Sequence, residues 1–309
     1  MIATSIVIPA YNEASRLHDG FARLSPVLDQ LGRDETEVII VDDGSSDATM
    51  DVARELYGTL ASALFLRQPE NRGKGAAVRL GVSVASAQYV IAADADMSIN
   101  PKHFPDLVAA LADADMVPGS RVDEGHIQYE SKVRTIAGKG FSRLARHYSG
   151  TTLRDTQCGC KGYRRGPARM LALLGMVDGF AFDVELLFLA TQLGLRVTPI
   201  NVTWDDVPGS SVNLNRHVLG MLGDLRSIKH TRYVNPVVEL APDVDVTAID
   251  TLARQTRMRG LVVARGAENA LLVLPRDGAV AGHTIAQSLA GTLRTATLSE
   301  LAKRTYDAV

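Results

Sequence analysis

Cysteine is scarce in this chain, and no sign of charge predominates. Among 309 residues only Cys158 and Cys160 occur. Their C-x-C spacing lacks the second pair of ligands that a structural zinc site needs, so we expect reduced thiols in a cytosolic compartment. The 33 lysines and arginines face 35 aspartates and glutamates, and the formal net charge of −2 gives no general attraction for nucleic acid. We therefore expect no nucleic-acid partner, and any anionic ligand must meet a local basic patch.

Long hydrophobic runs are also missing. Nowhere do eighteen consecutive apolar residues occur, so no membrane-spanning helix is expected. The first residues, MIATSIVIPAYNE, have no basic segment and run directly into a predicted core strand, so neither a signal peptide nor a transit sequence is expected. With 46% hydrophobic and 22% charged residues, the chain has the composition of a globular protein with one large core.

Strand and helix patterns alternate through the N-terminal third. Apolar runs at residues 5–8, 37–41, 63–67 and 89–93 predict strands, and segments with helical periodicity lie between them. This alternation predicts an α/β fold with a mostly parallel sheet covered by helices on both faces. In such sheets ligands bind beyond the carboxyl ends of the strands, and a polar cluster follows each of the four predicted strands.

Asp94 and Asp96 follow the fourth predicted strand, in the sequence YVIAADADMS. Alternation along the chain directs both carboxylates to the same side, where they repel one another unless a cation lies between them. Mg²⁺ and Mn²⁺ take oxygen ligands and bind through one or two carboxylates together with substrate phosphates. Both aspartates are therefore candidates for the metal site: Asp96 as a direct ligand, and Asp94 through a metal-bound water or by binding the ribose of a nucleotide. An acidic turn that caps the next helix explains the short motif equally well.

The other three clusters contain groups suited to a nucleotide. Pro9 ends the first strand, and Tyr11 offers a ring on which a nucleobase can stack. Glu13 and Asp42 can accept hydrogen bonds from a base or from ribose hydroxyls. Lys74, in the segment NRGKG, can place a positive charge near a diphosphate or a carboxylate of the site. Helix capping would give similar local patterns, but it explains neither the aromatic ring nor the double aspartate of the second cluster.

These segments, in this order and at these spacings, carry a family resemblance. IVIPAYNE, VIIVDDGSSDAT, NRGKGAAVRLG and ADADMS resemble the nucleotide-sugar half of a family 2 inverting glycosyltransferase with the GT-A fold, which is Rossmann-like. PGSR, RDTQCGCKGYRR, FAFDVELL and the W-x-x-V-P-G-S segment are similar to the branch that makes polyprenyl-phosphate sugars, most of all to dolichyl-phosphate glucosyltransferases. The resemblance extends over residues 4–230. It implies binding of a nucleoside-diphosphate sugar with Mg²⁺ or Mn²⁺; UDP-glucose is the first choice of donor and GDP-mannose the second.

Basic residues in the middle of the chain indicate an anionic acceptor. Arg121 follows a strand predicted over residues 115–118, and its guanidinium is suited to clamp a pair of phosphate oxygens. Arg134 is expected to bind the same charge. Residues 132–149 and 215–233 form two basic amphipathic segments that suit an anionic membrane surface. Packing of their apolar stripes on the core, with the charges facing water, explains the pattern equally well.

A second set of polar residues is expected opposite the metal. By the family resemblance, Asp155 and Gln157 border the sugar and the acceptor, in a segment where family members usually carry an aromatic residue in place of Cys160. Asp183 and Glu185 begin a predicted helix and can contact sugar hydroxyls or act as a base. Their alternative role is favourable charge at a helix N-terminus.

The acceptor determines what the reaction requires. Polyprenyl or dolichyl phosphate is already ionised at pH 7, so it needs positioning more than deprotonation, and it would place the enzyme at the cytoplasmic face of a membrane. A hydroxyl acceptor on a glycan or small metabolite needs a base, for which Asp155 or Asp183 is the candidate. Either acceptor gives inversion by a single displacement. A nucleotide-sugar-binding regulator without catalysis is a third possibility, and the intact D-A-D and D-T-Q segments argue against it.

The last quarter of the chain has no recognisable chemical motif. Pro236 and Pro242 predict a linker, so we expect a catalytic domain over residues 1–234 and a small α/β appendage over residues 235–309. Within the appendage, periodicity predicts helices at 247–257, 284–293 and 299–307 and strands at 260–263 and 270–274. Family members often carry transmembrane helices in this region, and this sequence departs from them.

Overall fold

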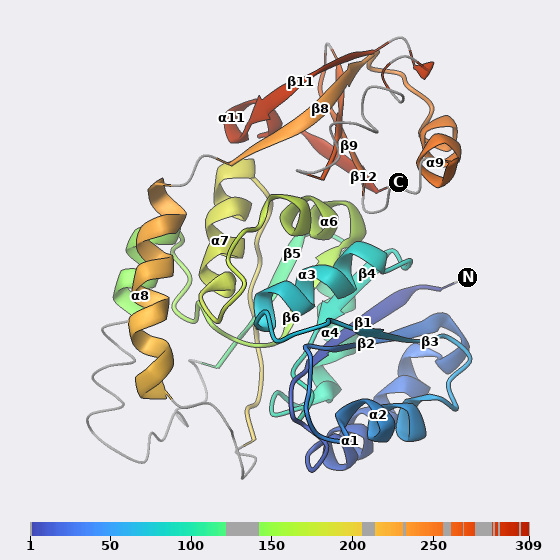
Figure 1. Ribbon diagram of the computed structural model, residues 1–309, viewed down its shortest axis with the longest axis vertical. Coiled ribbons are helices and arrows are strands. Elements are labelled where there is room, and N and C mark those ends of the chain that lie inside the picture. The colour runs from blue at the N-terminus through green and yellow to red at the C-terminus, as the bar shows by residue number, and fades with distance from the viewer. Residues whose placement is uncertain are drawn as a thin grey trace.

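Two β-sheets and the helices packed on them make up the computed structural model (Figure 1). The structure describes residues 2–121, 142–205, 214–230, 233–255, 261–267, 269–275, 286, 288, 289, 291–302 and 304–308. The larger sheet belongs to the N-terminal two thirds of the chain, and the smaller sheet is formed by the C-terminal residues.

The larger sheet has seven strands in the order β3-β2-β1-β4-β6-β5-β7. Their bounds are β1 Thr4–Ala10, β2 Thr36–Asp42, β3 Ala63–Arg67, β4 Tyr89–Ala92, β5 Met116–Ser120, β6 Lys161–Arg164 and β7 Ile200–Asn201. Strands β1 to β4 run parallel, β5 pairs in parallel with β7, and β6 runs antiparallel between β4 and β5. This arrangement confirms the predicted mostly parallel sheet.

Helices cover both faces of this sheet because its strands are apolar on both sides. The helices are α1 Leu17–Leu31, α2 Thr49–Tyr57, α3 Lys74–Val84, α4 Phe104–Ala110, α6 Arg165–Leu174, α7 Phe182–Leu193 and α8 Leu214–His230, with short 3-10 helices η1 Arg33–Glu35 and η2 Pro101–His103. Ile6 and Ile8 of β1 pack with α1, α2 and α4, whereas Val7 packs with α3, α6 and α7. Successive side chains of a strand point to opposite faces of the sheet, so the core is divided into two layers, one on each face.

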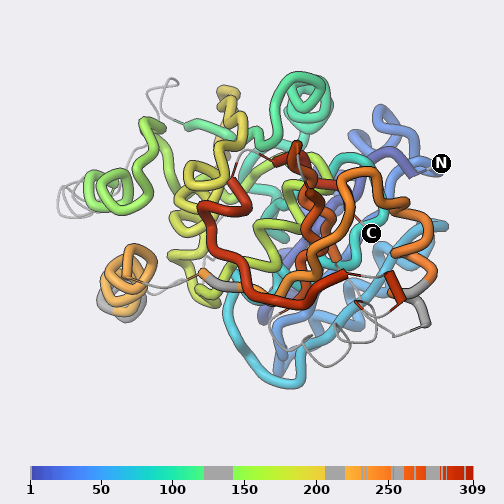
Figure 2. The backbone as a smooth tube through the Cα atoms, turned by 90° about the horizontal axis from the view of Figure 1, so that it is seen from above, coloured from blue at the N-terminus to red at the C-terminus, as the bar shows by residue number. Residues whose placement is uncertain are grey.

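The smaller sheet has five antiparallel strands in the order β11-β8-β10-β9-β12. Its elements are β8 Val234–Leu240, α9 Val246–Gln255, β9 Val262–Arg265, β10 Ala270–Val273, β11 Thr292–Thr297, α11 Leu298–Leu301 and β12 Thr305–Ala308. One face packs on α9, and the other shares a hydrophobic cluster with α6 and α7, which lie between the two sheets (Figures 1 and 2). A second, small C-terminal layer of strands and helices is therefore confirmed, and the division at residue 235 into two domains stays a prediction.

Two expectations for the C-terminal residues are wrong, and a third is right only in part. The predicted linker holds β8, in which Pro236 lies opposite Thr295 and its carbonyl accepts a hydrogen bond from the Leu274 N–H at 2.9 Å. The helix expected over 299–307 is the short α11 followed by β12. The helix expected over 284–293 is present at Ala286 and Ser288, but it ends before β11 begins at Thr292. These segments are short, and their conformation is set by partners across the sheet rather than by local periodicity.

Candidate active site

The predicted donor residues gather at one edge of the larger sheet. Asp42 is the last residue of β2, Glu13 follows β1, and Asp94 and Asp96 follow β4. Lys74 is the first residue of α3. Because β1, β2 and β4 are neighbouring parallel strands, their carboxyl ends bring these groups together, as the sequence predicts.

Two ion pairs balance the acidic groups beside β4. The ammonium of Lys74 pairs with the Asp94 carboxylate, and the guanidinium of Arg16 lies 2.8 Å from Asp96 Oδ2 while also pairing with Glu13. Burial acts to raise the pKa of Asp94, but the charge and hydrogen bond of Lys74 outweigh it and hold that pKa below its usual value. Burial raises the pKa of Glu13 to about 7, against the opposing effect of Arg16.

The acidic groups fit Mg²⁺ or Mn²⁺ only in part. Asp94 and Asp96 provide carboxylate oxygens, which these ions prefer, and Asp96 is fixed by the Ser98 N–H, which donates to Oδ1 at 3.0 Å. Within the described ranges, no group of three or more His, Cys, Asp or Glu side chains could hold a metal ion. An ion at this position would therefore need oxygens from a ligand such as a diphosphate. Lys74 and Arg16 would also have to yield part of their contact with the two carboxylates.

Asp42 and Glu13 each present a buried oxygen that has no hydrogen-bond partner among the described residues. Asp42 Oδ1 accepts from the Ser45 N–H at 2.8 Å, whereas Oδ2 has no hydrogen bond and lies 3.4 Å from Arg67 Nε in an ion pair. Glu13 Oε2 is likewise buried and without a hydrogen bond. Buried acceptors of this kind are costly unless a ligand or water meets them, so they suit the hydroxyl and N–H groups of a nucleoside.

The neighbouring residues shape this edge. Tyr11 is 43% exposed beside Glu13, where its ring is accessible for stacking, and Pro9 lines a small hollow together with Lys74 and Asp94. The second aspartate of the double-aspartate cluster, Asp43, accepts the N–H groups of Arg72 and Gly73 at 2.8 Å each. Asp43 therefore holds the segment before α3 in place, a role that sequence reasoning did not assign.

Arg121 and Asp155 form a bidentate pair on the acceptor side. Arg121 Nε lies 2.7 Å and Nη2 2.8 Å from the two carboxylate oxygens, and the Arg121 N–H donates to the same group at 3.1 Å. Burial acts to raise the pKa of Asp155, but the hydrogen bonds and charge of Arg121 outweigh it and hold that pKa below its usual value. The Gln157 N–H donates to Asp155 Oδ1 at 3.3 Å. Arg134, expected to act with Arg121, lies outside the described residues.

Asp183 is held by a buried lysine. Lys161 of β6 donates to Asp183 Oδ1 and to the carbonyl of Cys158, and both charged side chains are almost fully buried. The chain turns closely past Asp94 at Gly159, where a Cβ would lie 2.2 Å from Asp94 Oδ2. Arg16 is thus the main charged group that sequence reasoning left out of the site. Its signal was its position three residues after Glu13.

Comparison with known proteins shows the family of this chain. The model of Glycosyl transferase family 2 matches residues 5–171, more than half of the chain, so this chain belongs to glycosyl transferase family 2. Within the family it is similar to a dolichyl-phosphate beta-glucosyltransferase of Drosophila melanogaster, with 36% identity over 67% of this chain and 68% of the relative. The human dolichyl-phosphate beta-glucosyltransferase is 33% identical over 67% of this chain and 69% of its own.

Solved structures agree on the fold. Glucosyl-3-phosphoglycerate synthase from Mycobacterium tuberculosis, in complex with UDP, superposes with a TM-score of 0.57 and 21% sequence identity. The match covers 74% of this chain and 80% of the synthase. This likeness supports the GT-A fold of the larger sheet and its helices. Among the helices that the structure describes, none is long and apolar enough to cross a membrane.

Proposed function

We propose that this chain transfers glucose, with inversion, from UDP-glucose to dolichyl or another polyprenyl phosphate, in a reaction that uses Mg²⁺ or Mn²⁺. The proposal takes its substrates from relatives named dolichyl-phosphate beta-glucosyltransferase at 30–36% identity. The structural observation that carries it is the donor edge, the carboxyl ends of β1, β2 and β4. There Asp94 pairs with Lys74, and Asp42 and Glu13 each leave one buried acceptor oxygen.

The donor is expected to lie across the carboxyl ends of β1, β2 and β4. Tyr11 would stack on the base, and Asp42 Oδ2 and Glu13 Oε2 would accept hydrogen bonds from the base and the ribose. Asp94 and Asp96 would hold the ion, which when bound neutralises charge that develops on the diphosphate. Lys74, which pairs with Asp94, would add a second positive charge near the diphosphate and so favour departure of the nucleoside diphosphate.

The chemical class of the acceptor is inferred from Asp155 and Asp183, the two carboxylates that a hydroxyl acceptor would need as bases. Asp155 is clamped by Arg121 and has a lowered pKa, so it is a weak proton acceptor. Asp183 is held by Lys161 in a buried pair. A hydroxyl acceptor would need one of them to take a proton, whereas a lipid phosphate is ionised without help and requires only orientation. The geometry therefore favours a phosphate acceptor, with Arg121 as its expected binding group.

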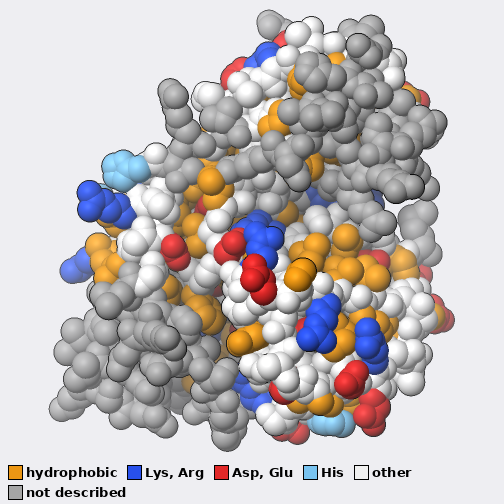
Figure 3. Space-filling model, in the orientation of Figure 1, with side chains coloured by type: hydrophobic (Ala, Val, Ile, Leu, Met, Phe, Trp, Pro, Cys, Tyr) orange, Lys and Arg blue, Asp and Glu red, His pale blue; other side chains and the backbone are white. Residues whose placement is uncertain are grey.

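The exposed face of α8 suits binding to an anionic membrane surface. On α8, Leu225 and Ile228 are buried in the core, while Arg226, Lys229 and His230 are exposed. Figure 3 shows basic side chains and a histidine gathered at the left edge of the molecule, over α8. Of the apolar stripe expected on this helix, Leu225 and Ile228 pack inward, whereas Leu222 is 39% exposed. The basic face remains for attraction to lipid headgroups.

The test is a comparison of acceptors with purified protein, UDP-glucose and Mn²⁺. We expect glucose transfer to dolichyl phosphate in vesicles and little transfer to glycans or small hydroxyl metabolites. Transfer to a hydroxyl acceptor with dolichyl phosphate left unmodified would refute the lipid acceptor. Vesicle binding should weaken as salt shortens the Debye length below about 8 Å, because the contact is electrostatic at an exposed surface. Vesicle binding that does not depend on salt would contradict the role of α8.

A further inference from the structure

A buried glutamate lies behind the donor site and is not used by the proposed reaction. Glu185 of α7 has no exposed surface. Its carboxylate accepts the N–H groups of Met176 and Val177 at 2.9 Å each and the hydroxyl of Tyr233 at 2.9 Å. Three donors thus converge on one fully buried carboxylate. A buried acid with this many fixed donors is a strong geometric constraint on the groups that bind it.

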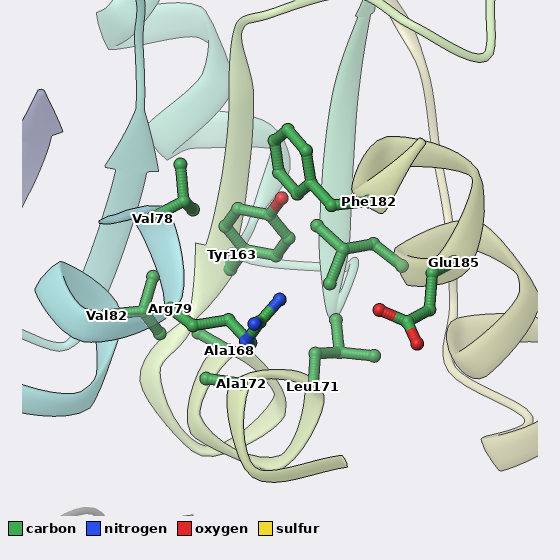
Figure 4. A pocket seen from close by; sticks show the side chains of 10 residues that line it. Val78, Arg79, Val82, Tyr163, Ala168, Leu171, Ala172, Phe182 and Glu185 are labelled. Carbon is green, nitrogen blue, oxygen red and sulfur yellow. The ribbon is translucent and has the colours of Figure 1, made fainter. Parts of the chain in front are cut away.

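The backbone that Glu185 holds is residues 175–178, which we call the support segment. Arg79 of α3 holds the same segment from the other side, because Nη1 donates to the Val177 carbonyl at 2.6 Å and Nη2 pairs with the Asp178 carboxylate. Figure 4 shows Arg79 and Glu185 lining the same small cavity from α3 and α7. This cavity provides about 20 Å³, close to the space of a single water molecule.

The support segment in turn fixes the start of α3. The Asp178 carbonyl accepts the Gly75 N–H at 2.7 Å and the Ala76 N–H at 3.3 Å, so it caps the first turn of the helix. The approach is close on both sides of Lys74: a Cβ at Gly73 or at Gly75 would lie 2.4 Å from a carbonyl oxygen of this segment. Any displacement of the support segment must therefore move the backbone that carries Lys74.

We propose that Glu185 is a positioning residue for the donor diphosphate, acting through the support segment on Lys74. The Tyr233 hydroxyl, directly before β8, is the third donor that holds the Glu185 carboxylate, so the start of the smaller sheet contributes to the alignment. This inference rests on the proposed function only in that Lys74 meets a nucleoside diphosphate. It does not depend on which acceptor is used.

The test measures UDP affinity by calorimetry with Mn²⁺ and the KM for UDP-glucose in Glu185→Gln. A glutamine offers one acceptor oxygen where the carboxylate offers two, so one donor loses its partner or meets an N–H group. We expect UDP affinity to fall about tenfold and the KM for the donor to rise to a similar extent, with the KM for the acceptor unchanged. Leu193→Ala, in the buried last turn of α7, is the matched control for general destabilisation. It should lower the melting temperature and leave both donor constants at the parent values.

A double-variant cycle tests the route through Lys74. If Glu185 acts through Lys74, the variant that combines Glu185→Gln with Lys74→Met should bind UDP no more weakly than Lys74→Met alone. Additive losses would refute this route. Parent-like UDP affinity in Glu185→Gln, with a lowered melting temperature, would reduce Glu185 to a stabilising residue.

A second variant keeps the proposal testable if Glu185→Gln does not fold. Tyr233→Phe removes one of the three donors and should weaken UDP binding about threefold, and unchanged UDP affinity would overturn the proposal. A parent that binds UDP with Mn²⁺ but transfers nothing to dolichyl phosphate would refute the proposed function. The UDP affinities of the variants would still decide the role of Glu185.

Discussion

Replacing Gly159 with alanine should displace the Asp94 carboxylate. A Cβ at this position would lie 2.2 Å from Asp94 Oδ2 and 2.8 Å from its Cγ. Ordinary contact between such atoms begins near about 3.5 Å, so the carboxylate must move by about 1 Å or more. This movement separates Asp94 from Lys74 and shifts one of the two expected metal ligands.

The size of the effect follows from the sensitivity of catalysis to position. A misplacement of about 1 Å can cost about 10²-fold in rate. In terms of the activation barrier this is about 3 kcal/mol. We therefore expect kcat/KM for UDP-glucose to fall about 10²-fold in Gly159→Ala. The assay is the initial rate of UDP release with Mn²⁺ and dolichyl phosphate at varied donor concentration.

Gly162→Ala is the matched control, because this glycine lies in β6, three residues further along the chain. Its Cβ would lie 3.2 Å from Leu111 Cδ1, the end of a flexible side chain, and not near the donor edge. This variant should lose some thermal stability and keep the donor kinetics of the parent. A folded Gly159→Ala enzyme with kcat/KM within threefold of the parent would refute the role of Asp94 as a positioned ligand.

Three further predictions concern single charged groups. The pKa of Glu13 is raised from 4.5 to about 7, so its contribution to stability is full below pH 4.5 and is lost as the pH rises through about 7. Glu13→Gln should remove this decline in the free energy of unfolding, which amounts to about 2 kcal/mol after allowance for solvent screening. Thermal unfolding of parent and variant without ligand, at several pH values, measures it. Stability profiles of parent and variant that run parallel across this pH range would contradict the prediction. Asp96→Asn should abolish the turnover that Mn²⁺ stimulates. If this variant reaches full activity in a Mn²⁺ titration, Asp96 is not a metal ligand. Arg121→Ala should raise the KM for dolichyl phosphate and lower the melting temperature, because Asp155 then stays buried without its partner, while calorimetry should find UDP affinity unchanged. An unchanged acceptor KM would rule out Arg121 as the acceptor group.

The donor edge was predictable because it depends on the order of strands and helices. Apolar runs of strand length predicted β1 to β4, and parallel pairing brings their carboxyl ends to one edge whatever the details of packing. The polar residues after each run could therefore be assigned to a common site without coordinates. Glu13, Asp42 and Lys74 all lie where this reasoning places them.

The partners of these residues could not be predicted, because they come from distant parts of the chain. Arg16 and Asp96 are 80 residues apart, and Tyr233 meets Glu185 across 48 residues. Local pattern indicated only that Glu185 begins a helix, and it suggested contact with sugar or a catalytic base. In the structure its carboxylate binds backbone N–H groups behind the site. Which way a buried acid points depends on packing that single-sequence periodicity does not contain.

The C-terminal sheet was harder to predict for a related reason. The segment Thr292–Thr297 has no long apolar run, and its pairing with β8 spans more than fifty residues of sequence. Strand formation here depends on neighbours on both sides and on burial against α6 and α7. Without those partners, residues 284–293 and 299–307 have patterns compatible with a helix.

The most direct test of the proposed function is the fate of labelled glucose from UDP-glucose in the presence of Mn²⁺ and dolichyl phosphate vesicles. We predict a labelled lipid product with β configuration at the anomeric carbon, and loss of its formation when the ion is chelated. Labelled glucose that appears only in water or on a hydroxyl acceptor, with no labelled lipid, would contradict the account.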